Sequence, residues 1–194
     1  MIRRMAWDLA IMEAVAEHRI GWVSTLARGL MAAGQPIGTY LAAAVVALLV
    51  AWRYRAWLPV GTSLLASVLA TGVAGAAKDA VGRPRPPADL ALVPATGMAM
   101  PSSIAALTAA AATPLVLAGW RSARGLARTA AVVLAVGTVT VGLCMVYLGA
   151  HWLSDVLVGW ALGAAIGVAV ARVLQLLARR LLRRPDPHLV GPAR

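Results

Sequence analysis

Long uncharged stretches separate short clusters of charge along most of this chain. Four of them run between residues 28 and 53, 55 and 78, 89 and 121, and 128 and 151. A fifth, from Asp155 to Ala178, is interrupted only by Arg172, whose long side chain can reach lipid headgroups from near a helix end. Because a helix needs about 20 apolar residues to cross a bilayer, the pattern predicts five spanning helices. They lie near residues 34–52, 57–77, 102–119, 128–148 and 154–177.

The N-terminal region has a different pattern. Between residues 5 and 30 a charge occurs in nearly every helical turn, at Asp8, Glu13, Glu17 and Arg19. Such charges are costly in hydrocarbon, so we expect this region to lie in the membrane interface, although a crossing N-terminus stays open. The fold class is therefore predicted to be an all-α membrane bundle with three parts. They are an N-terminal interfacial region (1–33), a transmembrane domain (34–178) and a basic cytoplasmic tail (179–194).

Composition supports a membrane protein and argues against a nucleic-acid-binding one. The chain is 61% hydrophobic, has a mean hydropathy of +0.79 and carries only 13% charged residues. That is more apolar surface than a soluble domain of this size buries. A net charge of +11 is typical of nucleic-acid-binding proteins, but membrane topology and anionic lipid explain most of the arginines here. We expect no nucleic-acid partner.

The basic residues also predict an orientation. Arginines follow the first, third and fifth predicted helices, at positions 53, 55, 121, 124, 128, 179, 180, 183 and 184. Short loops rich in Lys and Arg stay in the cytoplasm. The sequence therefore predicts a multi-pass protein of the cytoplasmic membrane with a cytoplasmic C-terminus. The loop between residues 79 and 100 and the link between 149 and 154 then face the extracytoplasmic side.

Polar residues that can bind phosphate cluster at the predicted outer ends of four helices. They are Lys78, Arg83, Arg85, Ser102, Ser103, His151 and Asp155. Three cations next to helix N-termini favour a site for a polyanion such as phosphate. His151 and Asp155 are four residues apart and would share one helix face. The carboxylate can fix the imidazole tautomer, which leaves the other ring nitrogen free as a base or nucleophile.

These residues resemble the type 2 phosphatidic-acid phosphatase and vanadium haloperoxidase superfamily. Its motifs are Lys-x6-Arg-Pro, Pro-Ser-Gly-His and Ser-Arg-x5-His-x3-Asp, and the chain reads "KDAVGRPRP" from Lys78, "PSSI" from Pro101 and "CMVYLGAHWLSD" from Cys144. The resemblance implies that Lys78 and Arg85 hold phosphate oxygens, helped by the backbone around Ser102 and Ser103. It further implies that His151 attacks phosphorus, that Asp155 orients His151, and that no metal or other cofactor is needed.

Two motif positions depart from the family pattern. Ile104 stands where the family has the His that protonates the leaving oxygen, and Met145 stands where it has the third-motif Arg. A positioned general acid contributes about a hundred- to ten-thousand-fold, and losing a donor to a developing oxyanion commonly costs ~3 kcal/mol. Weakened hydrolysis of phosphate monoesters is therefore expected. A diphosphate depends less on an acid because its leaving group is itself a phosphate, and Arg83 is a candidate source of part of the missing charge.

Three interpretations of function follow from the sequence. The first is a phosphatase acting on a phosphorylated or diphosphorylated lipid, either a polyprenyl lipid or a phospholipid, at the outer leaflet. The second is a catalytically silent relative that binds, presents or helps to transport such a lipid. The third is a purely structural membrane protein, which would leave the cation cluster without a role. A homo-oligomer or a membrane protein partner is left open.

Overall fold

A computed structural model describes residues 6–34 and 37–182, and all regular secondary structure in these residues is helical. The α-helices are α1 (Ala6–Glu17), α2 (Gly21–Gly34), α3 (Ile37–Tyr54), α4 (Trp57–Val81), α5 (Ser103–Trp120), α6 (Gly125–Tyr147) and α7 (Leu153–Leu182). A short 3-10 helix, η1 (Ala88–Leu90), lies in the long loop between α4 and α5. The all-α prediction is confirmed, whereas the last part of the predicted tail lies outside the described residues.

The predicted membrane spans coincide with helices of the structure. α4, α5, α6 and α7 are each long and apolar enough to cross a membrane. α2 and α3 are bent by 73° relative to each other, and they add one further span if the bent pair crosses the membrane as one unit. The span predicted at residues 34–52 thus falls on α3, with α2 as its bent extension. The number of spans is four or five, and the chain is a helical membrane protein.

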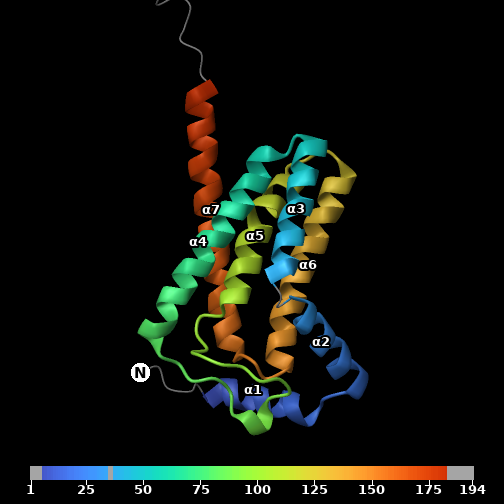
Figure 1. Cartoon of the computed structure of the whole chain (residues 1–194), viewed down its shortest axis with the longest axis vertical. Coiled ribbons are helices and arrows are strands. Elements are labelled where there is room, and N and C mark those ends of the chain that lie inside the picture. The colour runs from blue at the N-terminus through green and yellow to red at the C-terminus, as the bar shows by residue number, and fades with distance from the viewer. Residues whose placement is uncertain (1–5, 35–36, 183–194) are drawn as a thin grey trace, which may run out of the picture.

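The helices form a bundle in which α5 packs against α4, α6 and α7 (Figure 1). The C-terminal ends of α4 and α6 and the N-terminal ends of α5 and α7 lie at the lower end of the bundle in this view. α1 lies across this same end and contacts α6, α7 and η1. Segments that are far apart in the sequence therefore meet at one end of the molecule, which we call the α1 end.

Small residues let α5 approach its neighbours closely. Gly159, Gly163 and Gly167 recur every fourth residue on α7, and a Cβ atom added at Gly163 would lie 2.1 Å from the carbonyl oxygen of Ala106 on α5. Alanines of α4 and α5 form a buried cluster against which side chains of α7 also pack. Such small-residue faces are typical of helix packing in lipid, where backbones must come close. This packing fixes the N-terminus of α7 beside that of α5.

Two glycines shape the loops at the α1 end. Gly82 follows α4 with a φ of 60° and donates its N–H to the Lys78 carbonyl, which ends the helix in a left-handed cap. Gly149 has a φ of 72° and lies between α6 and α7. A Cβ atom there would lie 2.7 Å from the Leu90 carbonyl oxygen. Glycine at this position therefore lets the loop carrying His151 pass in close contact with the end of η1.

The N-terminal helices are docked onto the bundle by specific hydrogen bonds. Arg19, between α1 and α2, donates to the carbonyl oxygens of Tyr147 at 3.1 Å and Leu90 at 2.7 Å. The Tyr147 hydroxyl in turn lies 3.0 Å from the Ser24 hydroxyl on α2. These contacts attach α1 and α2 to the end of α6. They hold the N-terminal region at the α1 end, where the predicted site residues gather.

Candidate phosphate site

His151 and Arg85 lie in direct contact, although 65 residues separate them in the chain. Nη1 of Arg85 is 3.2 Å from Nε2 of His151, and it also donates to the Ala150 carbonyl oxygen at 2.6 Å. Nε of Arg85 donates to the carbonyl oxygens of Thr96 and Gly97. The guanidinium is thus held by backbone on two sides and lies against the free nitrogen of the imidazole. An anion bound by Arg85 would lie beside His151 Nε2.

Asp155 stands behind the imidazole, on the side opposite Arg85. Its Oδ2 is 3.4 Å from Nδ1 of His151, slightly outside the geometry of a hydrogen bond, and it accepts the backbone N–H of Trp152 at 3.0 Å. A proton on Nδ1 would face this carboxylate, which leaves the Nε2 lone pair toward Arg85. The i,i+4 prediction from the sequence thus corresponds to an observed pairing across the N-terminus of α7.

Burial favours the uncharged form of His151. Only a small part of the side chain is exposed, and this desolvation lowers the pKa of His151 below its usual value. Asp155 opposes the shift, while the positive charges of Arg85 and Lys78 reinforce it. Burial likewise lowers the pKa of Arg85, but an arginine starts so high that it stays protonated. The imidazole therefore lies beside a cation in surroundings that favour its neutral form.

Lys78 contributes a second positive charge at the same end. It lies in the last turn of α4, and its Nζ donates to the carbonyl oxygen of Met98 at 2.9 Å. A pocket of about 440 Å³ opens next to Arg85 between the loop that contains η1 and Gly149. Arg85 is the only charged residue among those that line it. The structure thus brings Lys78, Arg85, His151 and Asp155 to one end of the bundle.

Arg83 has an environment that the sequence did not indicate. Its side chain is completely buried, with Nη2 2.5 Å from Oδ2 of Asp8 and Nη1 2.7 Å from Oδ1 of Asp155. Nη1 also donates to the Ser154 hydroxyl, and the guanidinium carbon lies 5.5 Å from the centre of the Trp152 ring. Because two carboxylates occupy the guanidinium, we assign Arg83 to the support of Asp155 rather than to phosphate contact.

The two serines of the second motif begin α5. Ser102 is the N-cap, and its buried hydroxyl accepts the N–H of Ala105 and donates to the sulfur of Met145. Its backbone N–H donates to the Asp155 carbonyl oxygen at 3.1 Å. Ser103 is the first helical residue, and the backbone N–H groups of Ser103 and Ile104 have no partner among the described residues. These first amides of α5 are the donors there that an anion could use.

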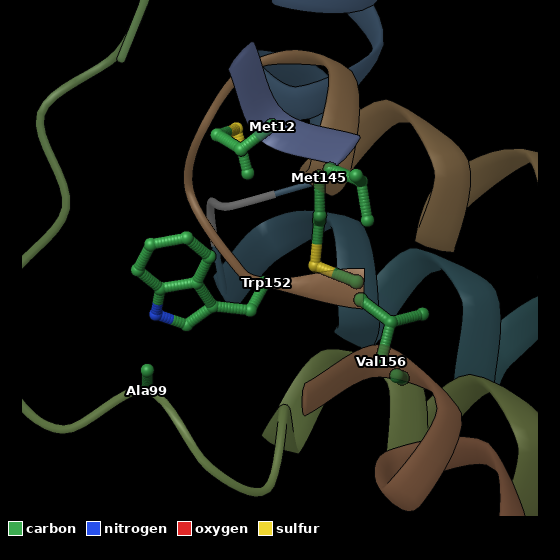
Figure 2. Close-up of a cluster of buried hydrophobic side chains, with 7 residues drawn as sticks. Met12, Ala99, Met145, Trp152 and Val156 are labelled. Carbon is green, nitrogen blue, oxygen red and sulfur yellow. The ribbon is translucent and has the colours of Figure 1, made fainter. Parts of the chain in front are cut away.

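The two departures from the family pattern both lie in apolar surroundings. Met145 is buried, and Figure 2 shows its side chain beside Trp152 and Val156, with Met12 of α1 nearby. Ile104 is partly buried and packs against the same cluster. Both residues also line a largely apolar pocket of about 270 Å³ between α2, α5 and α6. Apolar side chains thus occupy the positions where the family pattern places a proton donor and a cation.

The sequence does not identify two residues of the cluster. Its charge pattern predicts Asp8 to be one of several interfacial charges, yet Asp8 is buried and accepts hydrogen bonds from Arg83 and from the backbone and hydroxyl of Ser154. Nothing in the sequence indicates a role for Ser154. The available signal was weak: Asp8 precedes an apolar turn, and Arg83 was a cation without an assigned partner. Only the packing of α1 across the bundle pairs them.

Comparisons with known proteins agree with this arrangement. The family described as the PAP2 superfamily matches residues 56–179. No match to a curated protein was found. A crystal structure of a transmembrane PAP2-type phosphatidylglycerolphosphate phosphatase from Bacillus subtilis is similar, with a TM-score of 0.67, 24% identity, and coverage of 93% of this chain and 88% of that chain. The structure of Aquifex aeolicus LpxE gives a TM-score of 0.70 and 19% identity, with coverage of 89% of this chain and 99% of that chain.

At these identities the solved structures establish a shared fold. The family match extends from the start of α4 to the last turns of α7 and includes all three motifs. It covers well over half of the sequence. The chain therefore belongs to the PAP2 superfamily.

Proposed function

We propose that this protein binds a phosphorylated lipid at the α1 end and hydrolyses a diphosphate group slowly through a phosphohistidine. The observation that carries the proposal is the contact between Arg85 Nη1 and His151 Nε2, with Asp155 behind the ring. A phosphate held by Arg85, by Lys78 and by the first amides of α5 would place its phosphorus beside a neutral imidazole nitrogen. This is the geometry that nucleophilic attack requires.

The reaction would proceed in two steps. First, Nε2 of His151 forms a bond to the terminal phosphorus, and the bond from that phosphorus to the bridging oxygen breaks, so that the lipid leaves as a monophosphate. Asp155 stabilises the positive charge that develops on the ring. Water then attacks the phosphohistidine, the N–P bond breaks, and inorganic phosphate is released. Neither step calls on a metal ion or cofactor.

The apolar character of Ile104 and Met145 favours a diphosphate over a monoester substrate. A lipid alcohol is a poor leaving group unless an acid protonates its oxygen, and Ile104 supplies no proton. A lipid phosphate is a better leaving group than a lipid alcohol, because the pKa of its leaving oxygen is much lower. It therefore depends less on protonation by an acid. The same observation supports a second candidate function: a silent relative that binds the lipid without cleaving it.

The remaining surface features support a lipid ligand and an outward-facing site. The α3–α4 and α5–α6 connections lie at the end of the bundle opposite α1 (Figure 1), and arginines occur in or beside them at positions 53, 55, 121, 124 and 128. The positive-inside rule favours the cytoplasm for such an end. We therefore propose that the α1 end faces the extracytoplasmic side of the cytoplasmic membrane. The apolar pocket between α2, α5 and α6 would take the first part of the lipid chain.

Two measurements on the purified protein in lipid nanodiscs test the proposal. We expect saturable binding of a short-chain polyprenyl diphosphate and slow release of inorganic phosphate from it. Arg85→Gln and Lys78→Gln should each weaken binding roughly tenfold to a hundredfold, since a hydrogen bond to a charged group is worth about 1.5–3 kcal/mol. Arg121→Gln, an exposed cation at the other end of the bundle, is the matched control and should bind like wild type. Binding without phosphate release would favour the silent relative, and absence of both would exclude either function.

The apolar pocket gives an independent prediction. Gly137 lines it, and a Cβ atom there would meet nothing within 4 Å, so that a larger side chain can fill the pocket without clashing with backbone. Gly137→Leu is expected to raise KM for long-chain substrates several-fold while leaving KM for a water-soluble diphosphate unchanged. Gly72→Leu on α4, an equally open glycine outside the pocket, is the control. Equal effects on long and short substrates would show that this pocket does not hold the lipid chain.

A further inference from the structure

A buried carboxylate reaches the site from outside the region that matches the family. Asp8 lies on α1, whereas the match begins at residue 56. The Asp8 side chain is completely buried and accepts three hydrogen bonds. They come from Nη2 of Arg83 at 2.5 Å, from the Ser154 hydroxyl at 2.5 Å and from the Ser154 backbone N–H at 3.1 Å. A buried carboxylate is stable only with such partners, so α1 is docked through this residue.

Asp8 and Asp155 share one guanidinium. Nη2 of Arg83 faces Asp8, and Nη1 faces Oδ1 of Asp155. The other oxygen of Asp155, Oδ2, is left for the backbone N–H of Trp152 and for Nδ1 of His151. The division matters because a guanidinium facing a single carboxylate tends to bind both of its oxygens. With Asp8 in place, half of Arg83 is already occupied, and Asp155 keeps one oxygen directed at the imidazole.

The charges of this cluster also depend on Asp8. Two carboxylates and one guanidinium leave a net charge of about −1 behind His151, while Lys78 and Arg85 add positive charge on its other side. Without the charge of Asp8, Arg83 and Asp155 would cancel each other. No net negative charge would then stand behind a ring that must become positive when it attacks phosphorus.

We propose that Asp8 is a positioning residue that neutralises Arg83 so that Asp155 can act on His151, which makes the docking of α1 a condition for a reactive site. The importance of this for catalysis depends on the proposed role of His151 as nucleophile. The effect of Asp8 on the charge behind His151 does not depend on that role, because it acts on the imidazole whether or not any lipid is cleaved.

The titration of His151, followed by NMR of the protein labelled with ¹⁵N-histidine, tests the proposal. Arg83→Gln leaves two buried carboxylates, wild type and the double variant Asp8→Asn/Arg83→Gln leave a net single negative charge, and Asp8→Asn leaves none. The titration midpoint should therefore be highest in Arg83→Gln, similar in wild type and the double variant, and lowest in Asp8→Asn. Each step is expected to be about one pH unit. His151→Gln identifies the signal, and Glu13→Gln, an exposed charge on the same helix, should leave the midpoint unchanged.

The order of midpoints decides between a charge role and a structural one. If Asp8 only holds α1 in place, Asp8→Asn lowers the melting temperature but leaves the titration midpoint of His151 at its wild-type value. The double variant then has no shifted midpoint to restore. This result would overturn the proposal. If one single variant fails to fold, the midpoints of the other single variant, the double variant and the wild type still show whether the expected order holds. Phosphate release is measured separately, so that a silent protein with the expected midpoints would refute the hydrolysis and leave the role of Asp8 intact.

Discussion

Replacing His151 by Gln is expected to lower the rate of phosphate release by at least about a thousandfold and to leave lipid binding within a few-fold of wild type. The side-chain amide of Gln can still accept a hydrogen bond from Arg85, but it cannot form a covalent bond to phosphorus. Losing a nucleophile removes the whole covalent route. The cations that hold the ligand, Lys78 and Arg85, remain in place. A separation of kcat from binding is therefore the signature of this variant.

The control and the direct test follow from the same chemistry. His18→Gln removes an exposed histidine just after α1, whose Nδ1 lies 2.8 Å from the carbonyl oxygen of Ala14 on that helix, and it should leave the rate unchanged. Rapid acid-free quenching of the wild type with a labelled diphosphate should trap a base-stable, acid-labile phosphoryl group that His151→Gln lacks. Full activity in His151→Gln would mean that water attacks the substrate directly and that the phosphohistidine scheme is wrong.

The pH dependence of the wild type should reflect the lowered pKa of His151. Below that pKa the ring is protonated and Nε2 has no lone pair for attack, so the rate falls as the pH falls through it. Because burial moves the pKa down, the rate should hold to a lower pH than an unperturbed histidine would allow. Asp8 is expected to influence this pH dependence, since the negative charge behind His151 limits how far burial can lower the pKa of the imidazole.

The membrane spans and the gathering of Lys78, Arg85, His151 and Asp155 could be predicted from the sequence for physical reasons. A bilayer requires long uncharged stretches, so the spans are visible from the spacing of charged residues along the chain. Helices that cross in alternate directions bring every second connection to the same side. The motif residues lie in or beside the α4–α5 and α6–α7 connections, so they are expected at the same end of the bundle. The spacing of His151 and Asp155 predicts their pairing from a shared helix face, although His151 itself lies in the loop just before α7, which begins at Leu153.

The partners of Arg83 could not be predicted in the same way. Asp8 and Arg83 lie 75 positions apart in the sequence and belong to elements whose contact depends on how α1 lies across the bundle. A charge in nearly every turn indicated an interfacial helix, and nothing in that spacing distinguishes a solvated carboxylate from a buried one. The contact between Ser102 and Met145 could not be predicted for a related reason, because it depends on how the N-terminus of α5 packs against α6.

Restoring a proton donor at position 104 should raise hydrolysis of phosphate monoesters by about a hundredfold or more. Ile104 is in the first turn of α5, where Ser102 and the first free amides lie, and it is partly exposed. A histidine there can be accommodated, and a positioned general acid contributes about a hundred- to ten-thousand-fold. The gain should be much smaller for a diphosphate, whose leaving group needs little protonation. The ratio of the two gains is the diagnostic quantity.

Met145→Arg is expected to behave differently from Ile104→His, because Met145 is buried among Met12, Trp152 and Val156. A guanidinium placed there lacks water, and burying an unpaired charge destabilises a protein by several kcal/mol. We therefore expect Met145→Arg alone to lower the melting temperature, and orthovanadate, which mimics phosphate, to recover part of the loss by pairing with the new charge. The double variant, which combines Ile104→His and Met145→Arg, should cleave monoesters faster than Ile104→His alone.

Ile104→Asn is the control for Ile104→His, because its side chain is polar but cannot donate a proton as an acid. Equal rates for Asn and His at this position would show that the site no longer holds a leaving group where the family pattern places its acid.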